Sequence, residues 1–200
     1  LAHWETTLDL IDPLPITHLS LYNLTIEPHT LFFKHQAELL PLIPNEEASL
    51  AMFQAAVKKL SKKGLQQYEI SAFSYPGLES KHNTGYWIGR PFLGLGPSAF
   101  SYWEGKRFQN ISHLGRYLKL LEEGKLPIHF EERLEPEARK RELLVIRLRL
   151  LQGVCLETFV KDFGALDRAT ETTLKELTGE GFLRSRGGKI ALTEKGILFY

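Results

Sequence analysis

In the stretch ITHLSLYNL, residues 16–24, the even-numbered and odd-numbered side chains would face opposite sides of a strand, and Leu19 and Leu21 share one side. The stretch therefore predicts a mostly buried β-strand. A helix is predicted from Asn45 to Gly64, because Asn45 is a favourable N-cap and a glycine is a common stop. Residues 65–73, LQQYEISAF, then predict a second strand. A strand, a helix and another strand within about 60 residues are typical of a parallel βαβ unit. This half of the chain is therefore predicted to be α/β.

The glycine-rich run FLGLGPSAFSY, residues 92–102, predicts a third strand. It lacks the last glycine of the dinucleotide fingerprint and the Gly-Lys-Ser/Thr of a P-loop, so it does not indicate a phosphate site. Its glycines have two equally supported interpretations, close packing of a neighbouring backbone and close approach of a ligand. Ser112 is expected to cap the helix that follows at 113–124.

The last third of the chain has the outline of a winged helix. Helices are predicted at 135–153, 156–164 and 167–181, and two short strands are predicted around the glycine pair at 187–188. Residues 156–200 carry seven acidic and seven basic side chains. DNA binding depends on a clustered basic face that neutralises phosphates, so this region is interpreted as a packing module and nucleic acid is not expected as a partner.

Composition excludes several classes of protein. The formal net charge is +1, which gives no long-range field toward nucleic acid or anionic membranes. No apolar run approaches the roughly 20 residues needed to span a bilayer. A single cysteine, Cys155, excludes an internal disulfide framework and suits a reducing, cytoplasmic location. The opening at Leu1, in what resembles the end of a helix, predicts a fragment of a longer protein.

The stretch KHNTGYW, residues 81–87, lies in a segment predicted as a loop, 74–91, and has two interpretations. In the first, the aromatic side chains fill the core and the histidine is structural. In the second, the loop binds a flat, metal-bearing ligand. A histidine ring nitrogen can bind haem iron, aromatic side chains can pack on a porphyrin face, and an asparagine can hydrogen-bond a propionate. The residues alone leave both interpretations open.

Four stretches in order resemble one family. They are HLSLYNLTIEPHTLFF (18–33), GLQQYEISAFSYPGLESKHNTGYW (64–87), FLGLGPSAFSYW (92–103) and LTEKGILF (192–199). Together they resemble the C-terminal part of the HemW-type radical SAM haem chaperones, also described as oxygen-independent coproporphyrinogen III oxidase-like proteins. The resemblance covers essentially all 200 residues.

This resemblance implies an α/β fold in two parts. Residues 1–111 would be the closing strands and helices of an incomplete (β/α) radical SAM barrel. Residues 112–200 would be a linker helix and a small helical, winged-helix-like domain. The family's HNxxYW stretch is associated with haem, which carries over to His82, Asn83, Tyr86 and Trp87, with His82 as the possible iron ligand. Contacts with S-adenosylmethionine would fall near Thr25 and Phe100.

The sequence departs from the family in one respect. The family's CxxxCxxC motif, which holds a [4Fe-4S] cluster in the N-terminal half of the barrel, is absent. Two interpretations follow. Either the cluster and the cleavage of S-adenosylmethionine belong to a full-length protein and depend on an N-terminal half that is missing here, or the chain is a decayed copy that has lost them.

Two functions are expected from the resemblance. The favoured one is a haem chaperone that delivers haem to client haemoproteins and meets membranes only through those clients, because HNTGYW resembles the HemW form of this stretch. The alternative is an enzyme, the oxygen-independent coproporphyrinogen III dehydrogenase of porphyrin biosynthesis. The resemblance is compatible with an enzyme and with a chaperone that catalyses no reaction.

Overall fold

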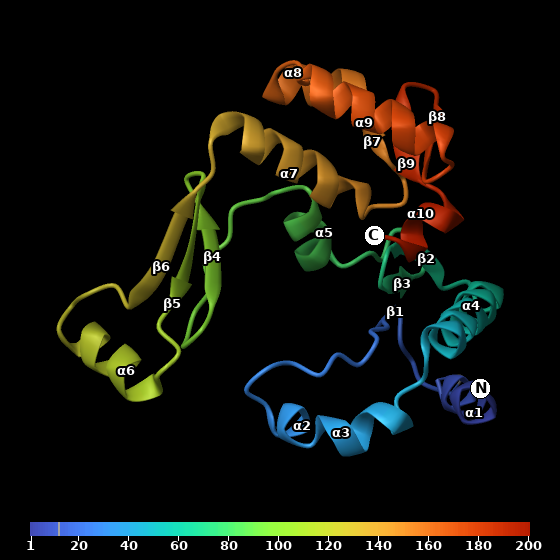
Figure 1. The fold of residues 1–200 in the computed structure, drawn as a ribbon, viewed down its shortest axis with the longest axis horizontal. Helices are drawn as coiled ribbons and strands as arrows, with labels where there is room; N and C mark the ends of the chain where they lie inside the picture. The colour runs from blue at the N-terminus through green and yellow to red at the C-terminus, as the bar shows by residue number, and fades with distance from the viewer. Residues whose placement is uncertain (12) are drawn as a thin grey trace. The chain divides into compact units, whose positions relative to one another are not determined.

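The computed structural model describes residues 1–11 and 13–200. The chain forms two compact units, Leu1–Ser80 and Lys81–Tyr200 (Figure 1). The division near residue 111 that the resemblance implies stays a prediction. Within the described part of the chain, no helix is both long enough and apolar enough to cross a membrane.

The first unit is built on a three-stranded antiparallel sheet in the order β1-β3-β2. The strands are β1 (His18–Ser20), β2 (Gln66–Glu69) and β3 (Ala72–Ser74). The strand predicted at 65–73 is thus a tight hairpin, because the chain turns at residues 70–71 and the Gln67 side chain donates to the Ile70 carbonyl. Strands β1 and β2 run in the same direction, as a βαβ unit requires. The predicted parallel pairing is wrong, since β3 is inserted between them.

Helix α4 (Glu46–Lys62) covers this sheet and confirms the predicted helix. The Asn45 side chain caps it by accepting from the Ala48 N–H at 2.8 Å, and Gly64 ends it with a φ of 85°. Leu60 and Phe73 are fully buried where helix and sheet meet. The other helices of this unit are α1 (Ala2–Asp9), α2 (Leu31–Lys34), α3 (Gln36–Leu39) and the 3-10 turn η1 (Leu40–Leu42).

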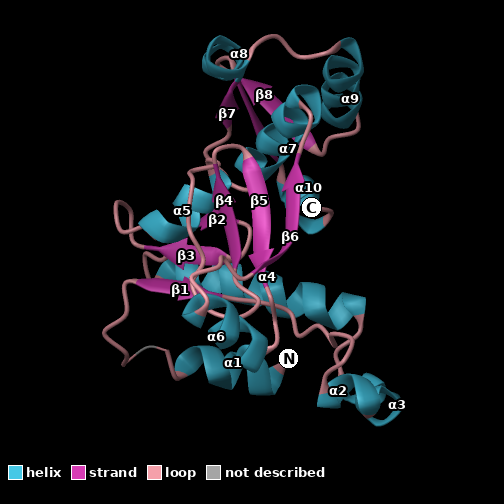
Figure 2. Ribbon diagram, turned by 90° about the vertical axis from the view of Figure 1, so that its left-hand side faces the viewer, coloured by secondary structure: helices cyan, strands magenta, loops and turns pink. Residues whose placement is uncertain are grey.

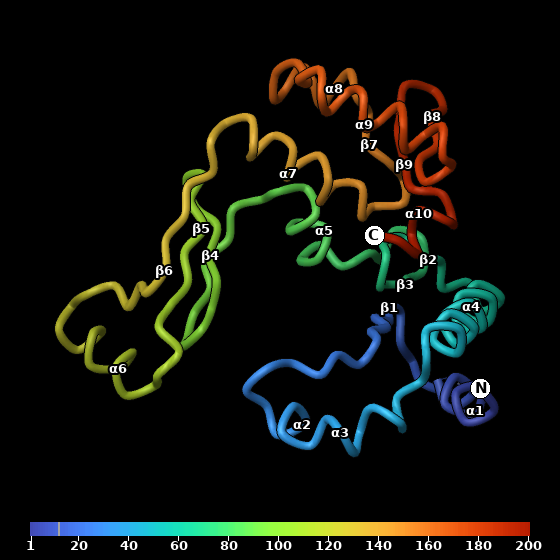
Figure 3. The backbone as a smooth tube through the Cα atoms, viewed as in Figure 1, coloured from blue at the N-terminus to red at the C-terminus, as the bar shows by residue number. Residues whose placement is uncertain are grey.

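The second unit begins with helix α5 (Lys81–Trp87) and a three-stranded antiparallel sheet. The strands are β4 (Phe100–Trp103), β5 (Lys106–Asn110) and β6 (Ile128–Arg133), and they lie side by side in Figure 2. Helix α6 (Leu114–Glu122) connects β5 to β6 at one end of the sheet (Figure 3). Its cap is His113, whose Nδ1 accepts from the Arg116 N–H at 3.3 Å, so the prediction of Ser112 as the cap is wrong by one residue.

The winged-helix outline at the C-terminus is confirmed. The helices are α7 (Pro136–Leu148), α8 (Leu156–Phe163), α9 (Arg168–Gly179) and α10 (Glu194–Leu198). The wing pairs β8 (Leu183–Arg186) with β9 (Lys189–Leu192), and the short strand β7 (Val154–Cys155) completes the sheet in the order β7-β9-β8. Gly187 and Gly188 both have positive φ, as the turn between the wing strands requires. Phe159 of α8 is fully buried in the core beneath these elements.

Candidate ligand-binding site

The stretch 81–87, predicted as a loop, is the helix α5. Gly85, in its middle, is buried, and a methyl group at that position would overlap the guanidinium of Arg90. Arg90 fastens the end of the helix, because its backbone N–H donates to the Gly85 carbonyl at 2.9 Å and its side chain donates to the Lys81 carbonyl at 3.2 Å. The loop prediction failed because it took no account of this closing arginine, which follows the helix by three residues.

Helix α5 directs its aromatic side chains toward two different neighbours. The Tyr86 ring makes edge contacts with His82 and with Phe92, each with 4.6 Å between ring centroids. Trp87 instead packs beneath Arg149, whose guanidinium carbon lies 4.2 Å from the indole centroid. Within the described residues, the buried indole N–H of Trp87 has no hydrogen-bond partner. Tyr86 and Trp87 therefore contact different parts of the second unit although they are adjacent in sequence.

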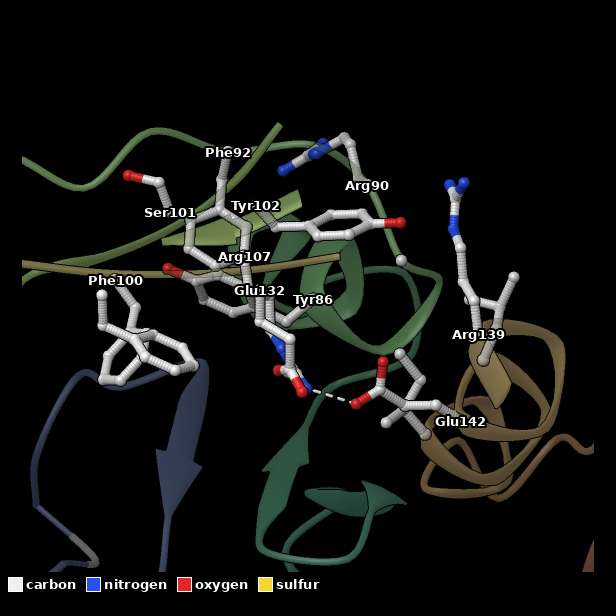
Figure 4. A pocket seen from close by; sticks show the side chains of 14 residues that line it. Tyr86, Arg90, Phe92, Phe100, Ser101, Tyr102, Arg107, Glu132, Arg139 and Glu142 are labelled. Carbon is white, nitrogen blue, oxygen red and sulfur yellow. Dashed lines mark hydrogen bonds and ion pairs between the residues drawn. The ribbon is translucent and has the colours of Figure 1, made fainter. Parts of the chain in front are cut away.

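Tyr86 faces a cavity of about 460 Å³ formed by strands β4 to β6, helix α7 and the segment after α5. Five aromatic rings line it: Tyr86, Phe92, Phe100, Tyr102 and Phe130. Figure 4 shows the rings of Tyr86, Phe92 and Tyr102 gathered close together. Ligand sites in proteins are typically concave and mostly apolar, with volumes of about 300–1,000 Å³. The cavity therefore suits a flat, largely apolar molecule.

Charged side chains also line the cavity. Arg107 of β5 lies between two carboxylates, 2.7 Å from Glu132 and 2.5 Å from Glu142 (Figure 4). The hydrogen bond to Glu132 raises the pKa of the Arg107 guanidinium above its usual value, and both carboxylates add to this by their charge. Two further arginines, Arg90 and Arg139, line the same cavity. With three arginines and two glutamates, the lining is positive by one charge.

The structure brings together two of the residues singled out from the sequence, Tyr86 and Phe100, which both line the cavity. His82 does not line it, but it is exposed on α5 and touches Tyr86. Asn83 is half-buried on α5 and also lies outside the lining. Trp87 packs on Arg149, as described above.

Thr25 belongs to the first unit, where it is exposed a few residues after β1. The cavity as described lies wholly within the second unit, so Thr25 and Phe100 are not placed relative to one another. The suggested contacts of both residues with S-adenosylmethionine stay predictions.

Sequence reasoning missed Tyr102, Arg107 and Arg139. A signal for Tyr102 was present, since alternate residues of a strand share one face and Phe100 had already been singled out. No comparable signal marked the arginines, because their approach to the aromatic rings depends on how β5 and α7 pack.

Comparisons with known proteins show what the sequence and the fold are similar to. Residues 134–199 match the family model of the HemN C-terminal domain. The chain is 30% identical to the "Heme chaperone HemW" of Bacillus subtilis over 99% of its own length and 52% of that protein. It is 33% identical to the protein of the same name from Lactococcus lactis, over 92% of the chain and 48% of that protein. The chain is thus similar to these HemW-named proteins, and its residues 134–199 are similar to the HemN C-terminal domain.

A solved structure supports the same fold. The coproporphyrinogen III oxidase HemN of Escherichia coli, described as a radical SAM enzyme, matches with a TM-score of 0.78 and 20% identity. The match covers 98% of this chain and 49% of that one. The fold is thus shared with about half of that protein, and in this chain it ends in a winged-helix-like domain. The chain spans about half the length of the HemW-type relatives it matches.

Proposed function

We propose that this chain is the haem-binding part of a HemW-type chaperone that delivers haem to client haemoproteins. The observation that carries the proposal is the cavity with five aromatic rings, next to a helix whose exposed histidine touches one of those rings. The names of the relatives support the chaperone role. The cytoplasm is the proposed location, which the single cysteine suits.

The residues present fit haem in two respects. Aromatic walls favour a flat macrocycle, because ring faces pack well on one another and remove apolar surface from water. His82 fits as an axial ligand, since it is exposed and neither of its ring nitrogens has a hydrogen-bond partner among the described residues. The edge contact with Tyr86 would hold the imidazole in a fixed orientation.

S-adenosylmethionine and the [4Fe-4S] cluster are proposed for the whole protein and not for this segment. A chain with a single cysteine cannot supply three thiolate ligands to a cluster. For S-adenosylmethionine, Thr25 and Phe100 are the candidate contacts, and the missing half of the barrel is the proposed partner. For the residues of this chain, we propose a single task, which is to bind and orient haem at α5.

Haem titration of the full-length protein tests this proposal. His82→Ala is expected to shift the Soret band of the bound state, because an axial nitrogen ligand is lost. His129→Ala is the matched control, since His129 is an exposed histidine on β6 that does not line the cavity. Identical spectra and affinity for wild type and His82→Ala would reject the ligand role and leave His82 a structural residue.

The alternative function is oxygen-independent oxidation of coproporphyrinogen III. The structural relative HemN suggests this function, but at 20% identity the likeness supports only the fold. The two functions differ in outcome when the full-length protein is reconstituted anaerobically with cluster, S-adenosylmethionine and coproporphyrinogen III. Formation of the vinyl product would favour the enzyme, whereas tight haem binding without turnover would favour the chaperone.

A further inference from the structure

We propose that Arg90 and Arg139 bind the carboxylates of the tetrapyrrole, so that its propionate edge lies at their end of the aromatic cavity. This inference rests on the proposed haem-binding function and adds to it the orientation of the ligand. It also assigns a role to two side chains that the HNTGYW stretch does not include.

The first argument concerns which cations are available. Arg107 is already held by Glu132 and Glu142 in two ion pairs, so its charge is compensated within the protein. Arg90 and Arg139 have no carboxylate partner among the described residues, although both line the cavity. The positive charge available to a ligand is therefore concentrated at these two side chains.

The second argument concerns how the two arginines are held. The Arg139 guanidinium lies over the Tyr102 ring, 5.6 Å from its centroid, which fixes the side chain without using its hydrogen-bond donors. Arg90 donates one hydrogen bond to the Lys81 carbonyl, and its guanidinium packs against Gly85. A guanidinium has five N–H donors in a planar fork that matches a carboxylate, so each arginine keeps enough donors to bind one.

The third argument concerns how charged and apolar side chains are distributed along the cavity. In Figure 4, Arg90 and Arg139 lie to one side with the phenol of Tyr102, and Phe100 lies at the opposite end of the group. A ligand that matches this arrangement is flat and apolar over most of its area and carries carboxylates on one edge. Haem has this distribution, since both of its propionates leave the same edge of the macrocycle.

The test compares haem with its dimethyl ester, in which both carboxylates are blocked, on the full-length protein. Arg139→Gln is expected to weaken haem binding about tenfold, as loss of a charge-assisted hydrogen bond does. The ester is expected to bind the wild type more weakly than haem binds the single variant, because it loses the contacts with both arginines, and Arg139→Gln should not weaken ester binding further. Arg90→Gln should behave in the same way. Arg133→Gln is the control, because Arg133 donates to the Glu104 carbonyl and does not line the cavity.

Iron-free protoporphyrin IX separates this inference from the haem-ligand proposal. It keeps the propionates but offers no iron to His82, so Arg139→Gln should weaken its binding whereas His82→Ala should not. Equal losses for haem and ester on Arg139→Gln would overturn the inference, because the arginine would then act through the fold alone. Absence of haem binding by the wild type would instead overturn the proposed function, and the inference with it.

Discussion

Trp87→Ala and Tyr86→Ala are expected to damage two different properties of the protein, although the residues are neighbours. Trp87 packs on Arg149, and the guanidinium of Arg149 also lies 5.3 Å from the ring centroid of Tyr200. The Tyr200 hydroxyl in turn donates to the Val145 carbonyl at 3.0 Å. Trp87 therefore helps fasten α5 to the end of α7 and to the C-terminus, which is a structural task.

The magnitude follows from this packing. Truncating a buried Trp or Phe to Ala costs about 3–5 kcal/mol, and the half-burial of Trp87 places it near the lower end, about 3 kcal/mol including the cation–π contact. For a unit of the size of Lys81–Tyr200, this corresponds to a fall in Tm of about 12 °C. Trp87→Phe, which keeps a ring beneath Arg149, should lose less than half of that.

Tyr86→Ala is expected to act on the ligand instead. It removes a ring from the cavity wall and the contact that orients His82, so haem affinity should fall about tenfold, or 1–2 kcal/mol. The assay is a thermal melt followed by circular dichroism, run beside a haem titration on each variant of the full-length protein. An unchanged Tm for Trp87→Ala together with a tenfold loss of haem affinity would refute the reasoning and return Trp87 to the ligand site.

Three further outcomes are expected from the second unit. Gly196→Ala should lower the free energy of unfolding by about 2 kcal/mol, because the added methyl group would overlap a backbone carbonyl. Gly179→Ala is the control, since the space around Gly179 is open, and urea denaturation compares the two variants. The pKa of the Asp167 carboxyl is lowered by a hydrogen bond from a backbone N–H at the start of α9 and by an arginine. The stability that this carboxylate contributes is therefore present above the unfolded pKa of about 4 and is lost as the pH falls through the lower folded pKa. Asp167→Asn should remove this pH dependence from a series of thermal melts. The pKa of the Cys155 thiol is lowered by the hydrogen bond from the Thr158 side chain, so Thr158→Val should move the midpoint of its alkylation rate to higher pH.

The sequence predicted those elements whose ends carry their own signals. Asn45 and Gly64 bracket α4, and the glycine pair at 187–188 marks the wing, because caps and tight turns depend on local chemistry. Strand β6 was missed, and the strand expected at 65–73 turned out to be a hairpin. Both errors concern pairing, and the pairing of strands is decided by long-range packing that a single sequence does not display.

The candidate site divides along the same line. Tyr86 could be singled out because it lies beside a histidine in an aromatic stretch, whereas Phe100 was singled out only because the family resemblance implied it. Arg139 could not, because it reaches the cavity from α7, more than fifty residues beyond α5. Charged residues on α7 alternate in sign, and from the sequence they indicated no more than a solvated helix face.

The helical form of HNTGYW explains why this stretch has its particular spacing. In an α-helix, residues four apart share a face, so His82 and Tyr86 contact one another, as their 4.6 Å centroid separation shows. The next residue is turned by about 100°, which directs Trp87 to the packing contact with Arg149 and away from the cavity. Gly85 leaves room for Arg90 to close the helix. One short helix thus carries the proposed haem ligand on one face, the packing contact with Arg149 on another, and the glycine against which Arg90 packs. An extended loop with the same residues would supply none of these relationships.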